Sequence, residues 1–367
     1  MSPVTVVYPA PVVLPTIGSV REVTAAGRER RRRGRRPWRS APRGWAGEGG
    51  QVAGTVAGIA AGPARTVAVI GVGRAGSALG AALAAAGHEV SAFYTRSPAG
   101  RERAAERFPT ATACATPAQA AAAAEVILLG VPDDLIETVA AQAAPGLTRS
   151  VPGGSLLPLV AHLSGRHGIA PLAPARAVGA RTAAIHPIMT LTGTPADVDR
   201  LTGATFGVTT VPGDEPAAAL VRRLVTDVGG RVAVVPEEQR PIYHAALVLG
   251  GNFLATLVTA AGRLIAEAGV PDPAGALGPL LRASLENALD GGAAAMTGPV
   301  RRGDVGTVTA QLAGLEALDR HLADAYAALA VLTADRLEQA GLLEPPVAAA
   351  VRAAATDAPA AGDRGWV

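Results

Sequence analysis

The sequence predicts an α/β domain with a mainly parallel sheet, followed by an all-α domain. Three observations predict this order. A short β-branched segment, Thr66–Ile70, leads into a glycine-rich turn and an alanine-rich helical segment. Further apolar segments of strand length alternate with helical segments as far as Val235, as in a sheet covered by helices. From Glu238 onward only helical patterns remain, separated by Gly and Pro breaks.

Charge is distributed unevenly along the 367 residues. All 33 residues counted as Lys+Arg are arginine, so a Schiff-base lysine, a lysine general acid and a phosphate-loop lysine are excluded. Residues 1–64 hold 10 arginines and 3 acidic residues, and the rest of the chain is mildly acidic. With 3% aromatic residues and no basic stripe, this body does not fit a nucleic-acid binder.

The ends of the chain differ from its body. Residues 1–64 show no helical or strand period, and we expect a disordered tail, either dispensable or the result of a start codon assigned too far upstream. The alternative is a twin-arginine export signal, but its apolar stretch, residues 52–61, is weak. We expect an α/β domain at 65–237, a helical domain at 238–343 and a frayed tail at 344–367. Cys114, the single cysteine, allows no internal disulfide and fits a cytoplasmic protein.

The glycine-rich turn predicts a dinucleotide site. Gly71 allows the tight turn, Gly73 lets the backbone approach a pyrophosphate, and Gly76 lets the helix pack on the strand. The pyrophosphate then binds at the free amides of the helix N-terminus, next to Val72, Arg74 and Ala75. This is the Rossmann-type arrangement.

The end of the second strand indicates which dinucleotide binds. Strand Glu89–Tyr94 is followed by Thr95, Arg96 and Ser97, where an NAD site would have an acidic residue. Arg96 and Ser97, with Arg101 and Arg103 beyond them, suit the 2′-phosphate of NADP (NADPH). The alternative is that these arginines only solvate the following helix.

Later strands place further polar residues at the same edge of the sheet. Val126–Val131 precedes Pro132, Asp133 and Asp134, where an aspartate is expected to cap the next helix; Val131 and Pro132 are expected beside the nicotinamide ribose. Leu156–Leu163 ends at Ser164, and Ala180–Ile185 ends at His186. The α/β part is completed by strand 205–211, helix 215–228 and strand 231–235.

Four long helices are expected after residue 238, at 240–268, 273–289, 304–318 and 321–340. The first contains an uncharged stretch, residues 245–262, at the lower length limit for a membrane span. Its polar and glycine residues favour a helix buried at a domain or subunit interface, with no membrane partner.

Over residues 66–341 the chain resembles a bacterial family described as a Rossmann-like domain plus domain of unknown function 2520. The matching segments include IGVGRAGSALG, VILLGVPDD, HLSG, IHPIMTLTGT, FGVT, RPIYHAALVLGGNFLATL and LENALDGGAAAMTGPVRRGD. More remotely, the layout is similar to ketopantoate reductases, pyrroline-5-carboxylate reductases and deazaflavin-dependent NADP oxidoreductases. The resemblance implies an NADP-linked oxidoreductase with a helical C-terminal domain like that of 6-phosphogluconate dehydrogenase, and a homodimer formed through the C-terminal helices. The lysine of ketopantoate reductases has no counterpart here.

Without lysine, histidine is the natural proton donor for reduction of a C=O or C=N bond. His186 follows a strand on the ligand side, and His244 begins the helix expected to face the nicotinamide. Ser164 and Asn252 are candidate hydrogen-bond donors to substrate. For each residue a purely structural role is the alternative.

Thr297 and Arg302, in a polar loop between helices, are candidates to bind a substrate carboxylate; solvated surface residues are the alternative. No metal site is expected. The sequence therefore predicts a reductase or dehydrogenase acting on CH-OH or CH-NH groups of a small molecule, such as a 2-keto or imino acid, in the cleft between the two domains. The alternative is a noncatalytic NADP-binding sensor or scaffold.

Overall fold

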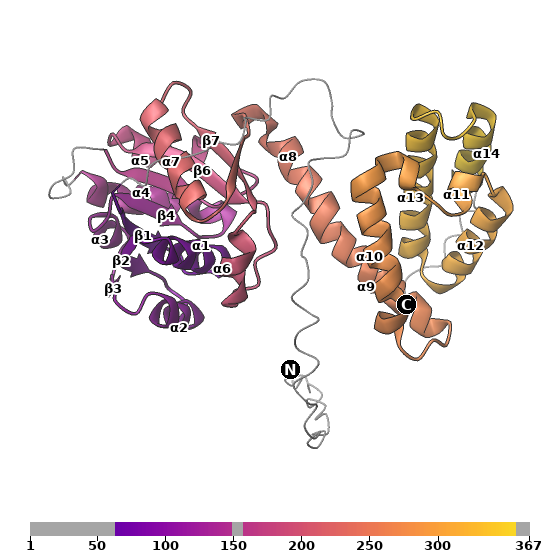
Figure 1. The fold of residues 1–367 in the computed structure, drawn as a ribbon, viewed down its shortest axis with the longest axis horizontal. Helices are drawn as coiled ribbons and strands as arrows, with labels where there is room; N and C mark the ends of the chain where they lie inside the picture. Colours follow the sequence, from indigo (N-terminus) through magenta and orange to yellow (C-terminus); the bar gives the residue numbers. More distant parts are fainter. Residues whose placement is uncertain (1–62, 149–156, 357–367) are drawn as a thin grey trace, which may run out of the picture. The chain divides into compact units, whose positions relative to one another are not determined.

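The computed structural model describes residues 63–148 and 157–356 (Figure 1). The expected disordered tail lies almost wholly outside the described residues. Packing of Cα atoms divides the chain between Pro279 and Leu280, so one compact unit contains the sheet and the helices up to that point. The expected boundary at 237 and 238 marks the change from sheet to helices, but the helices that follow it directly remain in the unit of the sheet.

An eight-stranded sheet forms the centre of this unit, in the order β3-β2-β1-β4-β5-β6-β7-β8. Every neighbouring pair is parallel except β6 and β7. The predicted strands are all present. The strands are β1 Thr66–Ile70, β2 Glu89–Tyr94, β3 Thr112–Ala113, β4 Val126–Leu129, β5 Leu159–His162, β6 Arg181–Pro187, β7 Thr205–Thr210 and β8 Arg231–Val234.

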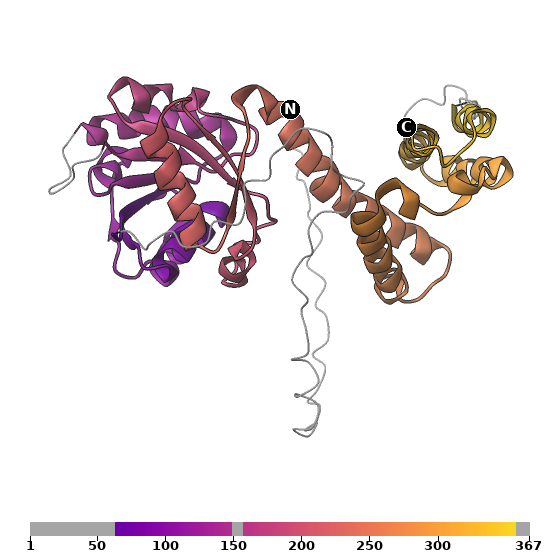
Figure 2. The same ribbon diagram turned by 45° about the horizontal axis from the view of Figure 1, so that its top comes forward.

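Helices cover both faces of the sheet (Figures 1 and 2). Side chains alternate along β1, so Val67 and Val69 enter one core while Ala68 and Ile70 enter the other. The first core is closed by α1 Arg74–Ala85, α2 Pro98–Arg107, α6 Ala196–Leu201 and α7 Glu215–Asp227. The second is closed by α3 Pro117–Ala121, α4 Ile136–Leu147, α5 Ala173–Ala177 and the 3-10 turn η4 Ala170–Leu172. A further 3-10 turn, η3 Asp133–Leu135, precedes α4. The fold is the predicted α/β Rossmann-type domain followed by helices.

A continuous helix, Glu237–Glu267, leads away from the last strand (Figure 1). It consists of the turn η5 Glu237–Gln239, helix α8 Arg240–Leu247, the π-helical segment η6 Val248–Phe253 and helix α9 Leu254–Glu267. The single helix expected at 240–268 is present, and the π-helical turn within it was not predicted. By length and composition this helix could cross a membrane. We expected this apolar helix to be buried at an interface, but the other described residues of the chain do not bury its apolar stretch.

The C-terminal unit is helical. Its core contains Val308, Leu312, Ala334, Leu337 and Val351. The elements from residue 273 onward are α10 Pro273–Gly291, η7 Gly292–Ala295, α11 Pro299–Arg302, α12 Val305–Leu318, α13 Arg320–Gln339 and α14 Pro345–Thr356.

The expected frayed tail at 344–367 is wrong for α14. Ala348, Val351 and Ala355 lie on one face of this helix and are buried in the core of the C-terminal unit. The segment was misread because its Ala and Pro content resembles that of a disordered tail, although alanine has the highest helix propensity. Residues 357–367 lie outside the described part.

Candidate functional site

Three glycines form a cradle at the carboxyl ends of β1 and β4. Gly71 has a φ of 90°, a conformation that favours glycine. A Cβ on Gly76 would collide with the carbonyl oxygen of Gly71, and a Cβ on Gly130 would lie 2.5 Å from the same oxygen. The turn, the start of α1 and the end of β4 can therefore approach each other only because none of the three residues has a side chain.

Gly73 differs from these packing glycines. An added Cβ would have one neighbour, the carbonyl oxygen of Gly130, at 3.4 Å. Gly73 is also the N-cap of α1, where no side chain caps the helix and the first turn contains no acidic residue. The first amides of an uncapped helix can donate to an anion. The glycine cradle therefore fits a diphosphate at Gly73, Arg74 and Ala75, beside the buried Val72.

Arginines surround the end of β2. Arg96 is exposed, and its carbonyl oxygen accepts a hydrogen bond from Arg101. The Ser97 hydroxyl accepts the amide of Gly100 at 3.0 Å and so caps α2. Arg103, which sequence reasoning grouped with these residues, instead donates its Nε–H to the carbonyl oxygen of Val72 at 3.0 Å and braces the glycine turn.

The loop after β4 departs from the prediction at one point. Val131 is partly buried and Pro132 is exposed, but neither Asp133 nor Asp134 caps a helix through its side chain. The chain passes through the 3-10 turn η3 before α4 begins at Ile136, so the expected aspartate cap is wrong. The Asp133 carboxylate instead lies close enough to His162 and His186 to favour their protonated forms.

The loop after β5 is held by His162, which is fully buried. Its Nδ1 accepts the amide of Ser164 at 3.1 Å, so Nε2 carries the proton and donates to the carbonyl oxygen of Gly168 at 2.5 Å. Burial is the main reason that the pKa of His162 falls to about 4. The Ser164 hydroxyl accepts the amides of Arg166 and His167, which is the local cap considered as its alternative role.

Arg240, at the first position of α8, connects this loop to the sheet. Its side chain is buried, with 1% of its surface exposed. The guanidinium donates to the Thr209 hydroxyl at 2.8 Å and to the Gly207 carbonyl at 3.1 Å. Longer contacts reach the carbonyl oxygens of Ser164, Gly165 and Ala184. Burial lowers the pKa of Arg240, but guanidinium groups stay charged in proteins, so the positive charge remains beneath the site.

Tyr243 and His186 form a hydrogen-bonded pair above Arg240. The Tyr243 hydroxyl lies 2.8 Å from His186 Nδ1, the two rings meet edge to face, and the Arg240 guanidinium lies 5.4 Å from the centre of the tyrosine ring. His186 belongs to β6 and does not follow it as expected, because Pro187 still pairs with Phe206 of β7.

Burial sets the protonation of both members of this pair. Burial, followed by the charge of Arg240 and the proximity of His244, lowers the pKa of His186 to about 4. Burial raises the pKa of Tyr243 to about 12, against the opposing effect of Arg240. At neutral pH His186 is therefore a neutral imidazole and Tyr243 keeps its proton.

His186 and His244 approach each other at Gly165. A Cβ on Gly165 would lie 3.0 Å from His186 Nε2 and 3.0 Å from His244 Cδ2, so both imidazoles pack against a position that has no side chain. His244 also lines a pocket of about 820 Å³. The other lining residues are Arg166, His167, Pro241, Ala245, Val248, Leu249 and Phe253.

The structure therefore brings together Ser164, His186 and His244, all within the unit of the sheet. Asn252 lies exposed in η6 and does not line the pocket. Thr297 and Arg302 are exposed residues of the C-terminal unit.

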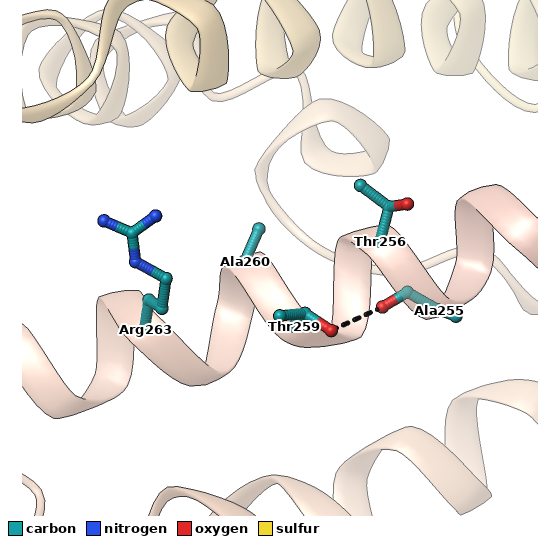
Figure 3. A pocket seen from close by; sticks show the side chains of 5 residues that line it. All are labelled: Ala255, Thr256, Thr259, Ala260 and Arg263. Carbon is teal, nitrogen blue, oxygen red and sulfur yellow. Dashed lines mark hydrogen bonds between the residues drawn. The ribbon is translucent and has the colours of Figure 1, made fainter. Parts of the chain in front are cut away.

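A second pocket, of about 440 Å³, lies along α9 (Figure 3). Ala255, Thr256, Thr259, Ala260 and Arg263 line it, and the Thr259 hydroxyl donates to the Ala255 carbonyl at 2.9 Å. Because all five residues belong to one exposed helix, this pocket is a stretch of helix surface without a second wall. In the described ranges no group of three or more His, Cys, Asp or Glu side chains could hold a metal ion.

Sequence reasoning missed Arg240, Tyr243 and Gly165. All three belong to segments that carry the family resemblance or adjoin it, Arg240 and Tyr243 in RPIYHAALV and Gly165 in HLSG. A glycine directly after a strand at the ligand edge could have indicated a close approach. Burial of Arg240 had no local signal, because it depends on where α8 meets β6 and β7.

Two family models match the sequence. One, described as a Rossmann-like domain, matches residues 54–187, and the other, described as domain of unknown function DUF2520, matches residues 205–333. The chain carries a Rossmann-like domain followed by a DUF2520 domain. This confirms the family resemblance, and the DUF2520 match begins within the sheet, at β7. None of the curated proteins matches the sequence.

Solved structures show the same fold. A protein from Bacteroides fragilis, described as a "putative NADP oxidoreductase", is 18% identical, with a TM-score of 0.59 over 73% of this chain and 96% of that chain. A Thermotoga maritima protein whose description names no activity is 22% identical, with a TM-score of 0.54 over 74% of this chain and 99% of that chain. The similar structures also include a pyrroline carboxylate reductase from Plasmodium falciparum, solved with NADP bound, at 16% identity and a TM-score of 0.48 over 80% of this chain and 97% of that chain.

Proposed function

We propose that this protein is an NADP-dependent oxidoreductase that reduces a small carbonyl or imine compound. One observation carries the proposal. The glycine cradle and the cluster of His186, Tyr243 and His244 lie at the same edge of one sheet and belong to one compact unit. Open α/β sheets bind their ligands at the carboxyl ends of the strands. The description of the Bacteroides fragilis protein as a "putative NADP oxidoreductase" supports this function.

The chain has suitable residues to hold the cofactor. The uncapped amides at Arg74 and Ala75 would bind the diphosphate, Arg96 and Ser97 the 2′-phosphate, and Val131 with Pro132 the nicotinamide ribose. When bound, NADPH supplies a hydride, which no amino-acid side chain can donate.

His186 polarises the acceptor bond in this proposal. Because Tyr243 keeps its proton, its hydroxyl donates to Nδ1 and fixes the tautomer in which Nε2 carries hydrogen. The Nε2–H group lies at Gly165 and donates to the carbonyl oxygen or imine nitrogen. A neutral imidazole suits this role, since it stabilises developing negative charge without first having to be protonated.

His244 donates the proton. As a C–H bond forms at the substrate carbon, the π bond breaks and its electron pair moves to oxygen or nitrogen, which takes a proton from the His244 ring. Solvent then reprotonates His244, which is only partly buried. The Ser164 oxygen accepts hydrogen bonds from two loop amides, so its O–H hydrogen is free to be donated to the substrate.

We also propose that a second copy of the chain covers the exposed apolar side chains of α9, beyond the pocket that His244 lines. Leu254 and Leu257 are each 39% exposed on α9, and the apolar window of the continuous helix is not buried. An apolar surface of this extent usually marks an interface. Sedimentation equilibrium should give a dimer, and Leu257→Arg, at a half-exposed position of α9, should shift it toward monomer. A monomer at every concentration contradicts the dimer, and co-sedimentation of the chain with lipid vesicles would indicate a bilayer instead.

Cofactor titration tests the main proposal. Wild-type protein should bind NADPH about 10- to 100-fold more tightly than NADH, and Arg96→Ser should remove most of this difference. Arg176→Ser, at an exposed arginine of α5, is the matched control and should retain it. NADPH oxidation with a panel of keto and imino acids then tests catalysis, which His244→Gln should reduce through kcat. Tight binding of NADPH without turnover of any panel member would favour the noncatalytic alternative.

A further inference from the structure

The pocket beside His244 has two unlike walls. The loop after β5 contributes Arg166 and His167, while α8 and η6 contribute the apolar side chains of Val248, Leu249 and Phe253. It is an open groove of about 820 Å³, a volume within the range of small-molecule sites. His244 lies in the lining, and His186, which does not, approaches the His244 ring at the buried Gly165.

Arg166 lines this pocket and is exposed. Its backbone amide is held by the Ser164 hydroxyl at 3.2 Å, which fixes where the side chain begins. Among the described residues its guanidinium has no hydrogen bond or ion pair, and no acidic residue lines the pocket. A guanidinium group matches a carboxylate through two parallel hydrogen bonds.

Two acidic residues lie near this region, and neither neutralises Arg166 in the pocket. The carboxylate of Glu237 accepts the amides of Ile169 and Ala170, at 2.7 and 3.2 Å. Asp133 lies toward His162 and His186. The buried charge of Arg240 adds to the positive potential beneath the histidines. The pocket therefore favours an anionic group.

The π-helical segment η6 contributes Val248, Leu249 and Phe253 to the apolar wall. Its backbone hydrogen bonds join residues five positions apart, as Val248 and Phe253 are, whereas those of an α-helix join residues four positions apart. Phe253 lines the pocket and Asn252 does not.

We propose that this pocket binds a 2-oxo or 2-imino acid with an apolar side chain. Arg166 binds the carboxylate, Val248, Leu249 and Phe253 contact the apolar group, and the C=O or C=N bond lies at His244 and His186. This inference rests on the proposed function and specifies its substrate class. It assigns the carboxylate to Arg166 and not to Thr297 or Arg302.

Binding can be measured without turnover. The probe is 4-methyl-2-oxopentanoate, titrated by calorimetry into the full-length protein, both alone and saturated with NADP⁺. Its methyl ester lacks the charge, and pyruvate lacks the apolar group. Wild-type protein should bind the acid about 10- to 100-fold more tightly than the ester, as expected for a charge-assisted hydrogen-bonded pair.

Substitutions of Arg166 and Phe253 test the two walls of the pocket separately. Arg166→Leu should abolish the preference for the acid over the ester, Arg166→Lys should retain part of it, and Arg176→Leu should leave it unchanged. Phe253→Ala should reduce the preference for 4-methyl-2-oxopentanoate over pyruvate and leave the preference for acid over ester intact.

The inference and the proposed function fail in different ways. NADPH-dependent turnover of ester and acid with equal kcat/KM overturns the inference and leaves the reductase proposal standing. Absence of acid binding both with and without NADP⁺ also overturns the inference. Acid binding that depends on Arg166, in a protein that binds no NADPH, supports the anion pocket and contradicts the reductase proposal.

Discussion

Replacement of Arg240 by methionine should perturb both stability and the charge of the site. The side chain is buried, and its closest acceptors are the Thr209 hydroxyl at 2.8 Å and the Gly207 carbonyl at 3.1 Å. A buried acceptor left without its donor costs about 1 to 3 kcal/mol. Two such losses, partly offset because no charge is buried in the variant, give a net destabilisation of about 2 to 4 kcal/mol.

The same substitution should change the histidines. The charge of Arg240 lowers the pKa of both His162 and His186, so each pKa should rise above about 4 in Arg240→Met. Burial is the larger cause in both cases and should keep the values below the ordinary 6.5.

Denaturant unfolding measures the stability change, and NMR titration of the imidazole Cε1 protons measures the pKa values. Arg176→Met, at an exposed position, should change stability by less than about 0.5 kcal/mol. If Arg240→Met is as stable as the wild-type protein and both imidazole pKa values are unchanged, then Arg240 neither stabilises the fold nor carries a charge that acts on the histidines.

Three further predictions concern the cradle, pH and the C-terminal unit. Gly76→Ala should weaken NADPH binding at least about 10-fold, because its Cβ would collide with the Gly71 carbonyl oxygen. The control Gly250→Ala, which has open space for a Cβ, should bind NADPH normally and gain up to about 1 kcal/mol in unfolding free energy. The folded-state pKa values of His162 and His186 lie below 6.5, so the unfolded chain binds more protons at mildly acidic pH. The unfolding free energy should therefore fall as pH falls from about 6.5 to 4, by roughly 2 kcal/mol per histidine at pH 5, and His162→Gln should show a shallower slope. Asp304 caps α12 through the amide of Thr307 at 2.9 Å, so Asp304→Ala should cost about 1 kcal/mol by thermal unfolding, and an unchanged midpoint would exclude the cap as a stabilising contact.

Local patterns were enough to predict most of the fold. Strands Thr66–Ile70 and Glu89–Tyr94 have the predicted bounds, because β-branched and apolar residues between turn signals determine strands over a few positions. The cap that Asp304 forms on α12 is equally local, since it depends on residues three positions apart.

The errors arose where distant segments determine the structure. The aspartates after β4 resemble a helix cap in sequence, but the 3-10 turn η3 precedes α4 and leaves Asp133 directed toward His162 and His186. Pairing of Pro187 with Phe206 extends β6 past His186. Packing against α13 orders α14, which composition alone had assigned to a tail.

The site was predictable only in part. The glycine motif is local, and parallel strands bring their carboxyl ends to one edge, so the cradle and the two histidines could be expected near one another. Burial of Arg240 and the Tyr243 hydrogen bond to His186 depend on how α8 meets the sheet, and the π-helical turn at Phe253 interrupts an otherwise regular helical pattern. No sequence period contains that information.

A single-turnover experiment with 4-deuterated NADPH tests the central claim most directly. With excess wild-type protein and 4-methyl-2-oxopentanoate, the account predicts deuterium at carbon 2 of the hydroxy acid product, and for the imino acid at carbon 2 of the amine. His186→Gln and His244→Gln should slow this transfer without loss of NADPH binding. Oxidation of NADPH with no deuterium in any product, or transfer that is equally fast in both variants, would contradict hydride transfer at this site.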